Sequence, residues 1–128
     1  MSYYFNKTLQ TGFEDAVTKV TEALKTEGFG VLTEIDIQAT LKKKLNVDFR
    51  KYKILGVCNP TFAYKALVVE DKIGLMLPCN VVVQETSKGH VEISAINPVE
   101  SMMAIENVNL NYIADEVQMK LKKVIASL

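Results

Sequence analysis

The chain has 128 residues, 48% of them hydrophobic, and its 15 Lys and Arg residues balance 15 Asp and Glu residues. This length corresponds to one domain, and a chain of this size buries about two-thirds of its unfolded surface, enough for a core without covalent staples. The balanced charge argues against nucleic-acid binding, because a general electrostatic attraction to phosphates needs an excess of clustered cations. We therefore expect a single domain, residues 1–128, that does not bind nucleic acid.

Neither a targeting segment nor a membrane span is indicated. The N-terminal residues MSYYFNKTLQTGF lack the basic segment and apolar run of a signal peptide. The longest apolar candidate, Ile73 to Val83, is interrupted by glycine, proline and asparagine and falls short of the roughly 18 apolar residues of a span. We expect a cytoplasmic protein without membrane contact, in which Cys58 and Cys79 are free thiols.

The first predicted elements are a strand and a helix. Ser2 to Leu9 is rich in β-prone residues. Apolar residues then recur at helical period, which predicts an amphipathic helix from Phe13 to Glu27. Thr11 and Glu14 have the spacing of a capping box, and Gly28 supplies a left-handed end to the helix.

A strand and a shorter helix follow. Phe29 to Ile35 reads as a strand with apolar residues on one face. Asp36 has the position of an N-cap for a helix whose predicted buried stripe is Ile37, Leu41 and Leu45.

The middle of the chain predicts a second strand–helix pair and a hairpin. The β-branched and aromatic residues of Tyr52 to Cys58 predict a buried strand. Asn59 and Pro60 are an N-cap and a first-turn proline for a helix that reaches about Glu70. Pro78 to Glu85 and His90 to Ile96 are two strands joined by a loop of hairpin length.

The last predicted element is a long helix. Its apolar residues recur at offsets of three and four from Leu110 to Leu128. Five predicted strands with interspersed helices favour a mostly antiparallel sheet with the two long helices on one face, a two-layer α+β sandwich.

Two junctions share an unusual pattern of residues. Cys58 and Asn59 end a strand and begin a helix, whereas Cys79 and Asn80 begin the strand after that helix. If the two strands are neighbours, both thiols lie at one end of the sheet, near the N-terminus of the helix that begins at Pro60. A helix N-terminus lowers a thiol pKa, and two thiolates suit Cu(I) binding, persulfide chemistry or disulfide chemistry.

The alternative is that both cysteines are structural. Free cysteine packs like a small hydrophobic residue, and the flanking residues of both strands are apolar. Asn59 and Asn80 are then a helix cap and a turn residue. Met102 and Met103 would widen a soft-metal site or, alternatively, serve core or dimer packing. The chain carries none of the common phosphate-loop, nucleophile-elbow or zinc-helix motifs.

At these same positions the sequence resembles the domain of unknown function 302 family of small bacterial and archaeal proteins. Four segments carry the resemblance: FGVLTEIDIQATLKKKL, YKILGVCNPTFAYKAL, IGLMLPCNVVVQE and VEISAINP. The resemblance implies a compact α+β fold with a curved antiparallel sheet, similar to the TATA-binding-protein-like group, and a homodimer. It implies no reaction.

Three functions are consistent with these features. The first is a non-catalytic ligand-binding or accessory protein with a small-molecule or soft-metal pocket at Cys58, Asn59, Cys79 and Asn80. The second is a thiol-dependent redox or sulfur-transfer enzyme, in which Cys58 is the nucleophile, Cys79 resolves it and Asn59 or Asn80 orients the substrate. The third is a structural homodimer module whose apolar surface is the interface. The sequence assigns no cofactor.

Overall fold

The computed structural model describes residues 2–128 as a five-stranded sheet and the helices that accompany it. The strand order is β1-β5-β4-β3-β2, and every pair of neighbours is antiparallel. The strands are β1 (Tyr4–Gln10), β2 (Gly30–Asp36), β3 (Tyr52–Cys58), β4 (Cys79–Ser87) and β5 (His90–Ile96). The helices are α1 (Phe13–Thr26), α2 (Ile37–Leu45), α3 (Pro60–Val69), the 3₁₀ turn η1 (Ile73–Met76), α4 (Pro98–Ser101) and α5 (Val108–Ala126).

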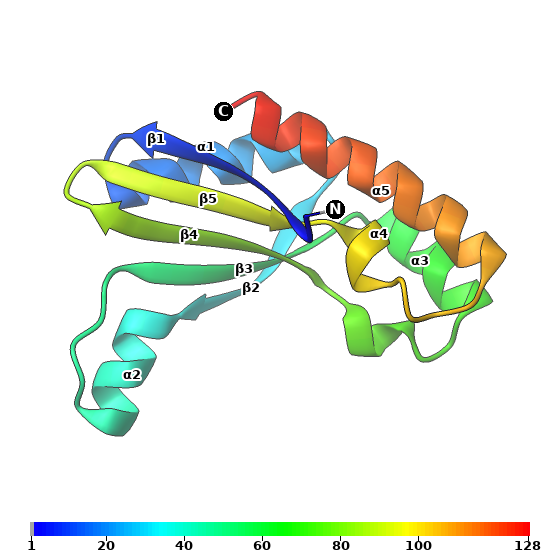
Figure 1. Ribbon diagram of the computed structural model, residues 1–128, viewed down its shortest axis with the longest axis horizontal. Helices are drawn as coiled ribbons and strands as arrows, with labels where there is room; N and C mark the ends of the chain where they lie inside the picture. The colour runs from blue at the N-terminus through cyan, green and yellow to red at the C-terminus, as the bar shows by residue number, and fades with distance from the viewer. Residues whose placement is uncertain (1) are drawn as a thin grey trace.

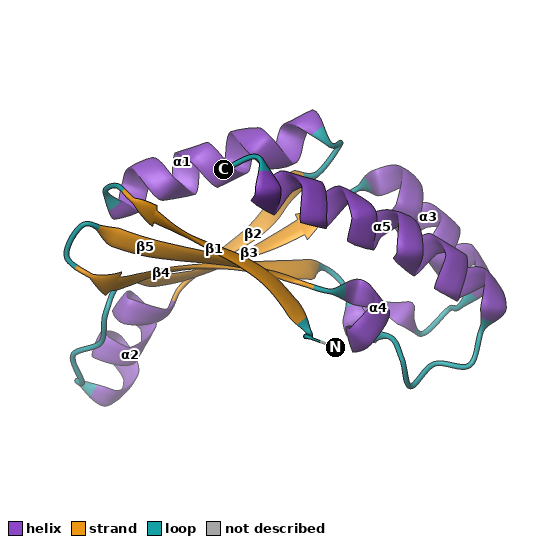
Figure 2. Cartoon of the chain, turned by 45° about the horizontal axis from the view of Figure 1, so that its top comes forward, coloured by secondary structure: helices purple, strands orange, loops and turns teal. Residues whose placement is uncertain are grey.

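The two long helices cover one face of the sheet. Figures 1 and 2 show α1 and α5 on the same side of the strands, whereas α2 lies on the opposite side at one end. This arrangement confirms the predicted α+β fold with two long helices on one face. Within residues 2–128, the other face of the sheet is largely uncovered, because α2 reaches only the end formed by β2 and β3.

The main core lies between the sheet and the two long helices. Alternate residues of β3, β4 and β5 point into it, because successive side chains of a strand face opposite sides. The fully buried residues from these strands include Leu55, Val57, Val81, Val83, Val91 and Ile93, and the helices contribute Val20, Leu24, Leu121 and Val124. A smaller second cluster lies under α3 and the start of α5 and consists of Ala66, Ile73, Met102, Leu110 and Ala114.

The ends of the predicted helices agree with the structure in part. Gly28 has a φ of 86°, the left-handed conformation predicted for it. Asp36 caps α2, since its Oδ1 accepts a hydrogen bond of 2.9 Å from the backbone N–H of Ala39. The predicted capping box of Thr11 is wrong: α1 begins at Phe13, its N-cap is Gly12, and no side chain caps it.

The predicted buried stripe of α2 is also wrong. The helix buries none of its nine residues, and Leu45 is 65% exposed. Figure 1 shows the reason: α2 belongs to the connection between β2 and β3 and lies beside only the end of these two strands. The stripe is therefore covered only in part: Ile37 and Leu41 are half-buried against the strands, and Leu45 is exposed.

None of the helices described for residues 2–128 combines the length and the apolar character needed to cross a bilayer.

Candidate functional site

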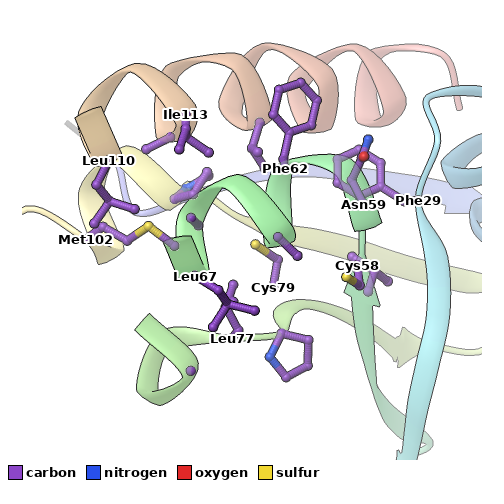
Figure 3. Close-up of a pocket in the computed structure, with 18 of the residues that line it drawn as sticks. Phe29, Cys58, Asn59, Phe62, Leu67, Leu77, Cys79, Met102, Leu110 and Ile113 are labelled. Carbon is purple, nitrogen blue, oxygen red and sulfur yellow. The ribbon is translucent and has the colours of Figure 1, made fainter. Parts of the chain in front are cut away.

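An apolar cavity lies where α3 and α5 meet the ends of β3 and β4. Its volume is about 350 Å³, and Figure 3 shows the side chains around it. Most of the wall is aliphatic or aromatic: Phe29, Leu32, Val57, Phe62, Ala63, Ala66, Leu67, Leu77, Leu110, Ile113 and Val117. Among residues 2–128, none that lines this cavity carries a charge.

Both cysteines line this cavity. β3 and β4 are neighbours, which is the condition for the predicted proximity of the two thiols. Val57 pairs directly with Cys79 at the end of the two strands. Cys79 is 8% exposed, whereas Cys58, the last residue of β3, is half-buried. Both thiols are free, and no disulfide joins them.

The electrostatics of both thiols favour the protonated form. Burial raises the pKa of Cys58. The pKa of Cys79 is raised to about 11, mainly by burial and further by Coulombic repulsion from Cys58. This direction is opposite to the lowering of the Cys58 pKa predicted from the start of α3, because removal from water disfavours the thiolate.

Asn59 lines the cavity but has a different role from the predicted cap. It occupies the N-cap position of α3, and its side chain makes no capping hydrogen bond there. Instead its Nδ2 donates a 3.1 Å hydrogen bond to the backbone carbonyl of Glu27, just after α1. Asn59 thus ties the end of α1 to the beginning of α3.

Asn80 lies outside this cavity. It follows Cys79 on β4, so its side chain points to the opposite face of the sheet, and it is exposed. The cavity therefore brings together Cys58, Asn59 and Cys79, and the fourth predicted residue faces away from them.

The methionine pair is divided in the same way. Met102 is 7% exposed and lines the cavity, whereas Met103 is 67% exposed and does not. Within residues 2–128, no group of three or more His, Cys, Asp or Glu side chains is placed to hold a metal ion.

Much of the cavity wall comes from elements that the sequence analysis did not connect with the cysteines. Leu110, Ile113 and Val117 belong to α5, about 30 or more positions after Cys79, and Leu77 precedes β4. The helical period of α5 identified these residues as apolar and inward-facing. The spacing of apolar residues does not show which other element α5 packs against. The position of these three residues in the cavity wall therefore could not be predicted from the sequence.

Comparisons with known proteins agree with this fold. The family model of the domain of unknown function DUF302 matches residues 5–128. The crystal structure of an uncharacterised conserved DUF302 protein from Bacillus stearothermophilus is similar, with a TM-score of 0.89 and 28% sequence identity over 98% of each chain. No functionally curated protein matches the chain. The family match over nearly the whole length and the shared fold establish that this chain belongs to the DUF302 family.

Proposed function

We propose that this protein is a non-catalytic binding protein that holds a small, neutral, apolar molecule in the cavity between α3, α5 and the ends of β3 and β4. The observation that carries this proposal is the apolar wall of the cavity, in which no charged side chain takes part. Ligand pockets are typically concave, mostly apolar and largely formed before binding.

The size of the cavity limits the ligand. A cavity of about 150 Å³ in another protein accommodates benzene. At the same density, a cavity of about 350 Å³ holds roughly fourteen non-hydrogen atoms. This is the size of a bicyclic aromatic compound or a medium-length alkyl chain.

The polar atoms around the cavity also favour a neutral ligand. The amide of Asn59 already donates to the carbonyl of Glu27, and the thiols of Cys58 and Cys79 are held protonated by burial. A charged ligand group would lose its hydration without gaining an ion pair in return. The weak thiol donors and the amide oxygen of Asn59 are side-chain polar contacts that remain for the ligand.

The raised thiol pKa values count against the thiol enzyme. A cysteine nucleophile reacts as the thiolate, and both thiols are shifted away from that form. A soft-metal version of the site would use the two thiols with the thioether of Met102. Replacement of Cys58 and Cys79 by serine separates the two versions, because it would abolish Cu(I) binding and leave the apolar cavity able to bind hydrocarbon.

Naphthalene is a suitable probe for the apolar cavity. We expect it to bind the protein with a rise in melting temperature and with NMR shifts at the backbone amides of Ala66, Cys79 and Ile113. The charged analogue 2-naphthoate should bind at least about tenfold more weakly, since its carboxylate has no cationic partner in the wall.

Two alanine variants provide the matched control. Ala63→Phe places a ring in the cavity and should abolish naphthalene binding, whereas Ala39→Phe adds the same ring on exposed α2 and should leave it unchanged. Naphthalene binding that survives Ala63→Phe, or equal binding of 2-naphthoate, would contradict the proposal.

A further inference from the structure

A second hollow lies on the opposite face of the sheet. Its volume is about 370 Å³, and it extends across the uncovered face of β1, β5, β4 and β3. Tyr4, Tyr52, Gln84, Glu92 and Ser94 are among the residues that line it. Of the lining residues, Glu92 is the one with a charged side chain.

The register of the sheet places Glu92 at one end of this hollow, beside Gln84 of β4. Glu92 pairs with Thr8 on one side and with Gln84 on the other, so its side chain points away from α1 and α5. Three neutral groups donate to its carboxylate: Asn6 Nδ2 at 3.3 Å, Gln84 Nε2 at 3.3 Å and Ser94 Oγ at 3.5 Å. These contacts hold the carboxylate in one orientation without neutralising it.

Arg50 fixes one of these donors. Its Nε donates a 2.9 Å hydrogen bond to Gln84 Oε1, and its guanidinium lies 4.4 Å from the centre of the Phe49 ring. Because the oxygen of Gln84 faces Arg50, the nitrogen of the same amide faces Glu92. Arg50 therefore orients Gln84 instead of pairing with the carboxylate, and within residues 2–128 no Lys or Arg side chain forms a salt bridge with Glu92.

The walls of the hollow are aromatic and aliphatic. Tyr3 and Tyr4 pack edge to face, with ring centres 4.9 Å apart, and Tyr52 lies on the other side of the hollow. Val82 and Ile96 contribute apolar surface between them. Aromatic faces attract organic cations through the ring quadrupole, and a carboxylate supplies the opposite charge.

From this arrangement we infer that the open face of the sheet carries a binding site for an organic cation, a protonated or quaternary amine attached to a small aromatic or aliphatic body. Glu92 pairs with the charge, Tyr4 contacts the body, and Asn6, Gln84 and Ser94 keep the carboxylate in place. The ring of Tyr52 is engaged by the Arg50 guanidinium, 5.7 Å from its centre, and bounds the site without contacting the cation. The site is separate from the apolar cavity, since the two lie on opposite faces of the sheet and favour ligands of different charge.

Three probes of similar size test this site. Isothermal titration calorimetry should detect benzyltrimethylammonium binding, at least about tenfold tighter than binding of neutral benzyl alcohol or anionic benzoate. The backbone amides of Asn6, Gln84 and Glu92 should shift in NMR spectra on addition of the cation. Binding should weaken as salt is added, because the carboxylate is partly exposed.

Two charge-matched variants locate the effect. Glu92→Gln should weaken benzyltrimethylammonium binding about tenfold, whereas Glu116→Gln, which removes an exposed carboxylate from α5, should leave it unchanged. Tyr4→Ala, at a residue that is 39% exposed, should weaken it about threefold while the melting temperature stays near that of the unmodified protein.

Failure of this inference is distinguishable from failure of the apolar-cavity proposal. Absence of cation binding, equal binding of benzyl alcohol, or unchanged affinity in Glu92→Gln would overturn the cation site. Naphthalene binding is expected to be the same in Glu92→Gln as in the unmodified protein, so each site has its own probe and its own variant.

Discussion

At the level of single residues, Cys79 shows how burial sets chemistry. The residue begins β4 beside Val57, under α3, and its thiol is nearly inaccessible to water. Burial, more than repulsion from Cys58, raises its pKa to about 11 from an ordinary value of 9.0. The same feature that makes this cysteine suitable for an apolar wall makes it a poor nucleophile.

The pKa of Cys79 predicts a loss of stability in alkaline solution. The folded protein holds this proton more tightly than the unfolded chain, so the stabilisation is complete below about pH 9 and is lost as the pH rises towards about 11. The difference of about two pKa units corresponds to roughly 3 kcal/mol in the free energy of unfolding. Urea denaturation across this range should show the loss, and Cys79→Ala should show a smaller one.

The control compares how steeply the free energy of unfolding falls with pH in each variant, because lysines and tyrosines also titrate in alkaline solution. Cys58→Ala should keep most of the alkaline loss but move it to lower pH, since the repulsion from Cys58 is gone. Parallel pH profiles for the unmodified protein and Cys79→Ala would contradict the assignment.

Gly56 is a position where space alone determines the residue. A Cβ atom there would overlap Thr33 Oγ1 on the neighbouring strand and lie 2.8 Å from Pro78 Cγ. We expect Gly56→Ala to lower the free energy of unfolding by about 1–3 kcal/mol. Gly30→Ala is the matched control on β2, where no atom lies within 4 Å of the added carbon, and equal denaturation midpoints for both variants would exclude this steric role.

At the level of elements, asparagine side chains hold α3 at both ends. Asn59 connects its beginning to the carbonyl of Glu27. Asn107 connects its end to the start of α5: Nδ2 donates to the carbonyl of Val69 at 2.8 Å, and Oδ1 accepts from the backbone N–H of Leu110 at 3.2 Å. Since α3 forms one side of the apolar cavity, these two residues position a wall of the candidate site.

The role of Asn107 predicts a selective effect of Asn107→Asp. The carboxylate still accepts the hydrogen bond from Leu110, but it no longer donates to Val69 and it faces the carboxylate of Glu70, 3.3 Å from the present amide nitrogen. We expect a loss of about 1–3 kcal/mol in the free energy of unfolding at neutral pH. The exposed Asn111→Asp should change stability by less than about 0.5 kcal/mol, and a similar value for both variants would argue against the bridge.

At the level of the whole molecule, the sheet is asymmetric. α1 and α5 cover one face, while the opposite face carries the second hollow and α2 extends beyond the strands without burying a residue (Figure 2). Both proposed sites follow from this arrangement, since one lies beneath helices and accepts apolar surface, whereas the other is open and carries an unbalanced carboxylate.

The resemblance to the DUF302 family predicts a homodimer, which native mass spectrometry can test. We expect the main species at micromolar concentration to have the mass of two chains, because α2 and the end of β2 leave apolar side chains such as Leu45 and Ile35 exposed. Dilution should yield single chains with the fold retained, as judged by circular dichroism. A single-chain mass at all concentrations would contradict the dimer.

Local patterns in the sequence determined most of the elements. The period of apolar residues located α1 and α5, and alternation with turn residues located the β4–β5 hairpin. Asp36 and Gly28 fixed two helix ends by chemistry that acts within four residues. These features can be predicted from the sequence because residues that are close in sequence are also close in space.

Only the tertiary structure determined which elements the apolar and polar side chains contact. Ile37, Leu41 and Leu45 have the spacing of a buried stripe, yet Ile37 and Leu41 are only half-buried and Leu45 is exposed. Cys79 and Asn80 are adjacent in sequence and lie on opposite faces of a sheet. The apolar wall from α5 and the pairing of Glu92 with Gln84 likewise depend on contacts between distant segments. The sequence alone determined which segments are apolar and where the thiols and carboxylates stand along the chain. Only packing determined their partners and their reactivity, because burial and strand register are properties of the assembled fold.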